Sequence, residues 1–117
     1  MTVLRIMPII ATDSVAEVRK FYSDLFGLDA VMDHGWLVTL ASGETTTPQV
    51  SIASEGGSGT PVPDLSIEVD DVDGVYRRAN EIAARVVYEL TDEPWGVRRF
   101  FVSDPTGKLL NVLTHLR

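Results

Sequence analysis

The run Glu93–Leu113, EPWGVRRFFVSDPTGKLLNVL, contains the most informative pattern in the chain. Its middle, DPTG at 104–107, has the chemistry of a tight turn, because Asp accepts from the backbone, Pro presets φ and Gly tolerates a positive φ. The flanking segments Phe100–Val102 and Leu109–Leu113 are apolar and suit strands. The run therefore predicts a β-hairpin with apolar side chains on both faces, and each face needs a cover.

The segments before this hairpin predict the rest of a small α/β module. Leu65–Val69 is a short apolar run typical of a strand. Asp70 or Asp71 is then expected to cap a helix whose apolar residues recur at helical spacing as far as Ala83. Arg85–Leu90 is predicted to be the next strand, and the hairpin adds two more. This half of the chain therefore reads β-α-β-β-β.

The first half of the chain predicts the same order of elements. Its expected segments are a strand at Val3–Ile10, a helix at Val15–Phe26, and strands at Leu28–Met32, Trp36–Ala41 and Gln49–Ala53. A polar loop over 42–48 separates the last two strands. Because each helix can cover only one face of its strands, the other face must curl around a partner half, a second chain or a ligand.

Three local features refine the prediction for the first half. Pro8 donates no hydrogen bond to a sheet, so its strand is expected at an edge or only partly paired there. Ser14 and Glu17 have the spacing of a capping box at the start of the helix. Gly27 is suited to end that helix in the left-handed conformation.

The domain organisation follows from the repeated order of elements. At 117 residues the chain is long enough for one domain, which we divide into module one (1–54), a Gly/Ser-rich linker (55–63) and module two (64–117). We predict an α+β fold in which two tandem β-α-β-β-β modules form a curved, open, eight-stranded barrel-like sheet with the helices outside.

Composition limits the possible partners and location. Lys and Arg number 10 and Asp and Glu number 17, for a formal charge of −7, which argues against nucleic-acid binding and is compatible with a cationic ligand or with simple solubility. There is no cysteine, which excludes disulfides and thiolate chemistry. No segment has the pattern of a signal peptide or membrane span, so a cytoplasmic protein without membrane contact is expected.

Three segments, in the expected order, carry a resemblance to a known family. The helix segment Ser14–Leu28, the strand-to-helix step Glu68–Asp73 and the closing hairpin Pro94–Leu110 are similar to those of the vicinal oxygen chelate superfamily, which includes glyoxalase I, bleomycin-resistance proteins and extradiol dioxygenases. The resemblance covers nearly the whole chain. It implies a homodimer that binds a small molecule on the concave face of the sheet.

The same resemblance implies where a metal would be held. Metal-dependent members hold a divalent ion with His, Glu or Gln side chains from four strands, and the ion polarises substrate oxygens as a Lewis acid. Here the matching positions are Met7, Ser51, Asp64 and Asn111, of which only Asp64 is a good ligand for a hard cation. We therefore expect no metal and no other cofactor, and a character closest to the metal-free bleomycin-resistance branch.

The functional hypothesis is binding or sequestration of a small planar or cationic molecule in the concave sheet cavity. The alternative is a metal-dependent lyase, isomerase or dioxygenase of the same superfamily with an atypical ligand set, so whether the protein is an enzyme stays open. A third hypothesis is an interaction protein whose concave face is filled by another chain.

Besides the four positions matched to metal ligands, five residues are candidate cavity contacts. Trp36 and Trp95 can stack on planar ligands or attract cations, with packing at the sheet ends as the alternative. Glu68 alternates with apolar residues, so with Asp64 it forms either an acidic wall or a solvated strand face. Arg99 and Phe101 share the face opposite Phe100, where Arg99 can pair with an anionic ligand or with Asp64 or Glu68.

The two histidines complete the candidates. His34 is predicted in a turn, where a solvated side chain is expected. His115 shares a face with Asn111 and Leu113 and reaches either the rim of the concave face or a frayed terminus. A zinc site using His115, Asp64 and Glu68 is a lesser alternative.

Overall fold

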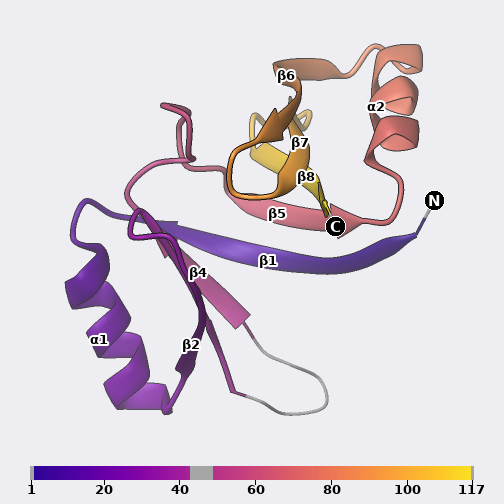
Figure 1. Ribbon diagram of the computed structural model, residues 1–117. Helices are drawn as coiled ribbons and strands as arrows, with labels where there is room; N and C mark the ends of the chain where they lie inside the picture. The colour runs from indigo at the N-terminus through magenta and orange to yellow at the C-terminus, as the bar shows by residue number, and fades with distance from the viewer. Residues whose placement is uncertain (1, 43–48, 117) are drawn as a thin grey trace. The chain divides into compact units, whose positions relative to one another are not determined.

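The computed structural model describes residues 2–42 and 49–116, so most of the predicted loop at 42–48 lies outside the described residues. Within them the two predicted β-α-β-β-β runs are present (Figure 1). The elements are β1 (Val3–Ala11), α1 (Val15–Phe26), β2 (Asp29–Asp33), β3 (Leu37–Ala41), β4 (Gln49–Ala53), β5 (Leu65–Val69), α2 (Val72–Glu81), β6 (Arg85–Glu93), β7 (Val97–Ser103) and β8 (Leu109–His115).

The strands follow the order β2-β3-β4-β1-β5-β8-β7-β6 and do not close into a ring, which confirms the predicted α+β class with an open eight-stranded sheet. The pairs β1–β4 and β5–β8 are parallel. The pairs β2–β3, β3–β4, β6–β7 and β7–β8 are antiparallel. The chain divides into two compact units. We call Met7–Val62 the N-terminal unit and Pro63–Arg117 with Met1–Ile6 the C-terminal unit, each as far as it is described.

In the N-terminal unit, α1 covers one face of its strands. The buried residues Val38, Leu40 and Ile52 form the core, and Val15 and Val18 of the helix pack against it. Because side chains alternate along a strand, Thr39 and Ser51 lie on the opposite face. The helix ends as predicted at Gly27, whose φ of 66° is left-handed and whose N–H donates to the Ser23 carbonyl.

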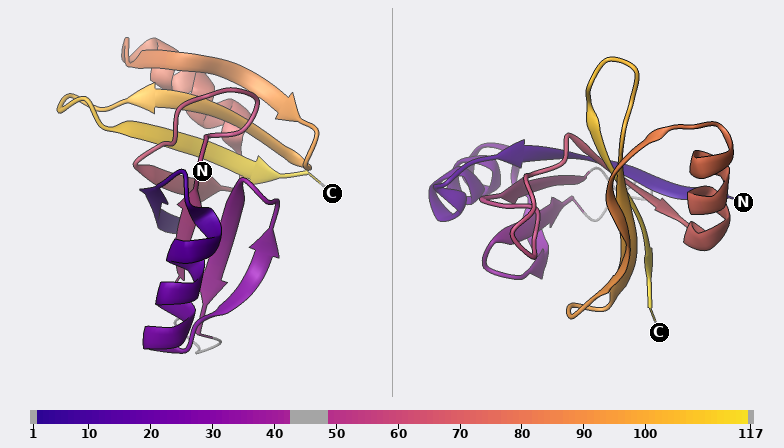
Figure 2. Two further views of the ribbon diagram at one scale, coloured as in Figure 1. Left: turned by 90° about the vertical axis from the view of Figure 1, so that its left-hand side faces the viewer. Right: turned by 90° about the horizontal axis from the view of Figure 1, so that it is seen from above.

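In the C-terminal unit, α2 lies along one face of β6, β7 and β8 (Figure 2). Phe100, Val112 and Val69 of the strands form a buried cluster with Val72 and Ala79 of the helix. Tyr76 of α2 meets the Phe100 ring edge-on, with centroids 5.0 Å apart. This arrangement confirms that one apolar face of the closing hairpin is covered by the second helix.

The turn of that hairpin has the predicted chemistry. Asp104 Oδ1 accepts hydrogen bonds from the N–H groups of Thr106 and Lys108, at 2.8 and 2.9 Å, and Gly107 has a φ of 87°. The hydroxyl of Thr106, followed by these N–H groups, holds the pKa of Asp104 below its usual range. The carboxylate therefore stays charged while it organises the turn.

Two strand predictions need correction in detail. Of the two alternatives for β1, the edge position is wrong, because the strand lies between β4 and β5 in the strand order. Partial pairing at Pro8 is confirmed on the β4 side, where the register begins at Ile9, directly after Pro8. β6 continues three residues beyond the predicted end at Leu90 and stops at Glu93. Trp95 consequently lies in the tight β6–β7 turn rather than in a longer loop.

The predicted capping box at Ser14 is also wrong. The Ser14 side chain makes no capping hydrogen bond to α1, and its hydroxyl lies 3.4 Å from Asp13 Oδ1. At α2 the expectation holds for Asp71, whose Oδ1 accepts from the Gly74 N–H at 3.0 Å. Neither helix within the described residues is long and apolar enough to cross a membrane.

The segment predicted as a linker, 55–63, contains no helix or strand. It includes a hydrogen-bonded turn, in which the Gly56 N–H donates to the Thr60 carbonyl at 2.7 Å and the Thr60 hydroxyl donates to the Gly57 carbonyl at 2.7 Å. A Cβ on Gly56 would lie 2.1 Å from the Pro61 carbonyl oxygen, so the close approach of these backbones requires glycine.

Candidate functional site

The face of the C-terminal unit that points away from α2 carries its buried polar residues. Strand pairing sets Phe101 of β7 opposite Asn111 of β8, and Asn111 opposite Ser66 of β5. Arg99 lies on the same face, two residues before Phe101. We call this surface, made by Ser66, Arg99, Phe101 and Asn111, the polar face of the unit.

Asn111 carries one unsatisfied polar atom on this face. It is 8% exposed, and its Nδ2 donates to Ser66 Oγ at 3.0 Å. Its Oδ1 is buried and has no hydrogen-bond partner among the described residues. A buried amide oxygen without a donor is unfavourable by about 1–3 kcal/mol. The polar face therefore presents one acceptor to any donor that reaches it.

Arg99 is paired within its own unit. Its Nη2 lies 2.6 Å from Glu93 Oε2, and both side chains are 3% exposed. The Tyr88 hydroxyl donates to the other carboxylate oxygen at 3.1 Å. Glu93 is therefore the ion-pair partner of Arg99 within the C-terminal unit.

Aromatic rings surround the Arg99 guanidinium. Its central carbon lies 4.7 Å from the Phe101 ring centroid, 4.9 Å from that of Trp95 and 5.4 Å from that of Tyr88. Such distances are within the range of cation–π attraction. The chain's own cation thus already contacts two of the aromatic side chains, Trp95 and Phe101, that the sequence indicates as ligand contacts.

Glu93 and Tyr88 are residues that sequence reasoning missed. Register shifts occur between Val86 and Tyr88 and between Tyr88 and Thr91, so strict alternation fails along β6. Thr91 pairs with Arg99, and Glu93 lies two residues further on the same face. If β6 had been predicted to extend beyond Leu90, it would have included Glu93. The sequence contains no signal for the register shifts of β6, however, so the face on which Glu93 lies could not be predicted.

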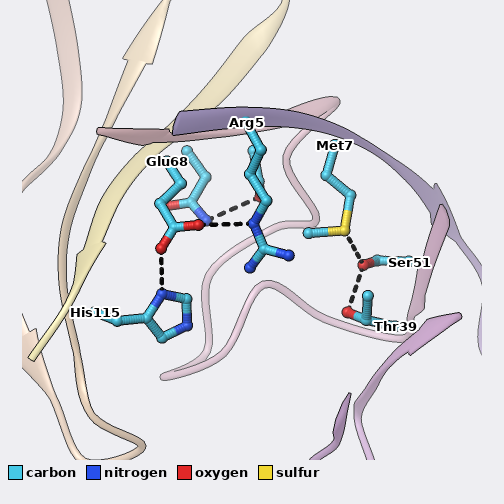
Figure 3. A network of polar contacts seen from close by, with 8 residues as sticks. Arg5, Met7, Thr39, Ser51, Glu68 and His115 are labelled. Atoms are coloured by element: carbon cyan, nitrogen blue, oxygen red, sulfur yellow. Dashed lines mark hydrogen bonds and ion pairs between the residues drawn. The ribbon is translucent and has the colours of Figure 1, made fainter. Parts of the chain in front are cut away.

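Glu68 joins two other charged or titratable residues of the C-terminal unit (Figure 3). Its Oε1 lies 2.7 Å from Arg5 Nε, and its Oε2 lies 2.6 Å from His115 Nδ1. Partial burial would raise the pKa of Glu68, but the hydrogen bond from His115 and the charge of Arg5 outweigh it and lower that pKa. His115 belongs to β8 rather than to a frayed end.

A cavity of about 310 Å³ lies beside this pair and is lined by Leu4, Glu68, Asp70, Thr114 and His115. All five lining residues belong to the C-terminal unit. Asp64, by contrast, is exposed, and its carboxylate accepts from the Leu109 N–H at 2.8 Å. Asp64 therefore holds the start of β8 in place.

In the N-terminal unit two candidate residues, Met7 and Ser51, form a short chain of uncharged groups with Thr39 (Figure 3). The hydroxyls of Thr39 and Ser51 are 2.8 Å apart, and the Ser51 hydroxyl donates to Met7 Sδ at 3.0 Å. All three side chains are buried. Trp36, just before β3, is half-buried and stacks on His34 with ring centroids 6.1 Å apart.

These contacts test whether a divalent ion fits the positions that the resemblance implies. Met7 and Ser51 bind each other, Asp64 binds the β8 backbone, and Asn111 binds Ser66. Throughout the described residues, no three His, Cys, Asp or Glu side chains are grouped so that they could hold a metal ion. A thioether, a hydroxyl and an amide are poor ligands for hard cations, so this donor set does not fit such an ion.

The comparisons with known proteins agree with the fold. Residues 2–112 match the family model described as the Glyoxalase/Bleomycin resistance protein/Dioxygenase superfamily. No curated protein sequence matches the chain.

Several solved structures share the fold at low sequence identity. A member of the same superfamily from Vibrio splendidus 12B01 is 20% identical with a TM-score of 0.70, over 97% of this chain and 99% of that one. A methylmalonyl-CoA epimerase from Streptomyces coelicolor is 16% identical with a TM-score of 0.67, over 97% and 96%. A Legionella pneumophila protein described as an NAD-dependent benzaldehyde dehydrogenase is 12% identical with a TM-score of 0.76, over 95% and 99%. At such identities the likeness to solved structures shows the fold alone. The family model, by contrast, matches most of the sequence, and the chain therefore belongs to the Glyoxalase/Bleomycin resistance protein/Dioxygenase superfamily.

Proposed function

We propose that the protein binds a small planar or cationic molecule on the polar face of its C-terminal unit, without a metal ion. The observation that carries the proposal is the buried Asn111 Oδ1 without a partner among the described residues. A ligand with an N–H or O–H group would supply the missing donor and recover the free energy that the buried oxygen costs.

The surroundings of Asn111 favour a planar ligand over a flexible one. Phe101 is the cross-strand neighbour of Asn111, and its ring adds an apolar, polarisable surface beside the acceptor. The chain's formal charge of −7 raises the local concentration of cations and lowers that of anions. A planar cation with an N–H donor satisfies all three features.

Titration of tryptophan fluorescence would test the proposal. We expect proflavine, a planar cation with N–H donors, to change the emission of the protein and raise its melting temperature. N-methylacridinium, which is planar and cationic but has no N–H group, should bind about tenfold more weakly because it cannot satisfy Asn111. Naphthoate, a planar anion, should give no response.

The variant Asn111→Leu makes this test specific. It removes the acceptor and should abolish the preference for proflavine over N-methylacridinium. The matched control Thr114→Val, on the same strand and half-buried, should leave the preference intact. Equal affinity of the wild-type protein for the two cations, or no response to either, would count against the proposal.

Metal analysis separates this function from the alternative of a metal-dependent lyase, isomerase or dioxygenase. Because the matching side chains are a poor donor set, we expect substoichiometric metal after purification without chelator. Zn²⁺, Ni²⁺, Mn²⁺ and Fe²⁺ should likewise produce no thermal shift. A stoichiometric ion, lost together with ligand binding on chelation, would favour the alternative.

The homodimer and the cytoplasmic location stay predictions from resemblance and composition. Light scattering on the purified protein measures the first directly, and a mass of twice the 12.8 kDa chain is the expected result. Fractionation of the source cells measures the second.

A further inference from the structure

We propose that the C-terminal unit has a separate binding site for a protonated primary amine, in which His115 Nε2 accepts an N–H of the ammonium group beside Glu68 and Asp70. This site goes beyond the proposed function because it uses none of the residues of the polar face. Along β8, His115 lies four residues from Asn111, roughly 13 Å at about 3.3 Å per residue.

The first step of the argument is the orientation of the imidazole. Glu68 Oε2 lies 2.6 Å from His115 Nδ1, and the other carboxylate oxygen pairs with Arg5. A carboxylate can only accept, so Nδ1 carries a proton toward Glu68, and in the neutral ring Nε2 is then the nitrogen with the lone pair. The Nε2 lone pair is then available, and among the described residues Glu68 is the one hydrogen-bond partner of His115.

The second step is the charge around this lone pair. The cavity of about 310 Å³ beside His115 is lined by two carboxylates, Glu68 and Asp70, and, as far as the chain is described, by no Lys or Arg. The Thr2 N–H donates to Asp70 Oδ1 at 2.7 Å, and this bond holds the pKa of Asp70 below its usual range. Asp70 is therefore charged at neutral pH, so the cavity favours a cation over an anion.

The third step decides which kind of cation fits. The Nε2 lone pair requires an N–H donor, which a quaternary ammonium group lacks. Two carboxylates and one imidazole nitrogen are not arranged as a metal site among the described residues. Leu4, which is 57% exposed, adds an apolar wall for a short alkyl stem. A primary alkylammonium ion meets these requirements together.

The charged groups around the imidazole are the ones that the ammonium group would meet. They are Glu68 of β5, Asp70 directly after that strand and Arg5 of β1, while the β7 neighbour of His115, Val97, is uncharged.

Nitrogen NMR of the two histidines provides the test. At about pH 8 butylammonium should shift the ¹⁵Nε2 resonance of His115 and leave His34 unchanged. Butyltrimethylammonium has the same charge and alkyl chain but no N–H, and it should produce no shift at His115. The free protein should show the Nδ1–H tautomer at His115, set by Glu68.

Two histidine variants show whether the amine binds at His115 or elsewhere on the protein. His115→Phe removes Nε2 while keeping a ring of similar volume, and it should abolish butylammonium binding measured by calorimetry; His34→Phe is the matched control and should retain it. Equal responses to the two ammonium ions, a shift at neither histidine, or an Nε2–H tautomer at His115 would overturn the proposal. The outcome is independent of the proposed function, because Asn111→Leu should leave amine binding intact and His115→Phe should leave proflavine binding intact.

Discussion

The two units share one order of elements but have different chemistry on the face away from their helix. In the N-terminal unit this face carries an uncharged chain of Met7, Ser51 and Thr39. In the C-terminal unit the corresponding face carries the buried ion pair of Arg99 and Glu93. In both units the alternation of side chains along the strands places apolar residues on the face that meets the helix. The residues on the face away from the helix can therefore differ between the units without changing the order of elements.

The largest expected effect comes from breaking the ion pair of the C-terminal unit. Arg99→Met should lower the free energy of unfolding by about 4 kcal/mol, because it leaves the Glu93 carboxylate buried without its cation. Chemical denaturation measures this loss. The double variant Glu93→Met/Arg99→Met should be less destabilised than Arg99→Met alone, since no uncompensated charge remains. Additive losses in the double variant would show that the two side chains do not act as a pair.

The corresponding change in the N-terminal unit should have a smaller effect. Thr39→Val keeps the shape of the side chain and removes one hydroxyl, while Ser51 still donates to Met7. The expected loss is about 1 kcal/mol, because only one uncharged hydrogen bond disappears. The control Thr39→Ser keeps the hydroxyl and loses only a methyl group. A loss from Thr39→Val as large as that from Arg99→Met would contradict the difference we draw between the two faces.

Much of the fold could be predicted because it follows from local patterns. The apolar alternation of Phe100 and Val112 predicts which side of the hairpin meets a helix, and the DPTG turn at 104–107 predicts where it reverses. Gly27 marks the end of α1 for the same kind of local reason. Each of these features depends on residues close together in the sequence.

The features that sequence reasoning missed depend on long-range pairing or irregular backbone. With strict alternation along β6, Tyr88 and Glu93 would lie on opposite faces of the strand. The register shifts of β6 bring both side chains to the face of Arg99. The bond between Asn111 and Ser66 requires the parallel pairing of β5 with β8, across 45 positions of sequence. The interior place of β1 likewise depends on partners far along the chain.

The smallest effect concerns the two helix starts, which look alike in sequence and differ in structure. Asp71→Ala should lower the free energy of unfolding by about 1 kcal/mol, because Asp71 Oδ1 caps α2 by accepting from the Gly74 N–H. Ser14→Ala should change it by no more than a few tenths of a kcal/mol, because the Ser14 side chain makes no capping bond to α1. Asp71→Asn is the control, since its amide oxygen can still accept. Denaturation curves of the three variants decide the point: equal losses for Ser14→Ala and Asp71→Ala would mean that Ser14 caps α1 in solution. A difference between them would show that the capping pattern of the sequence is used in only one of the two units.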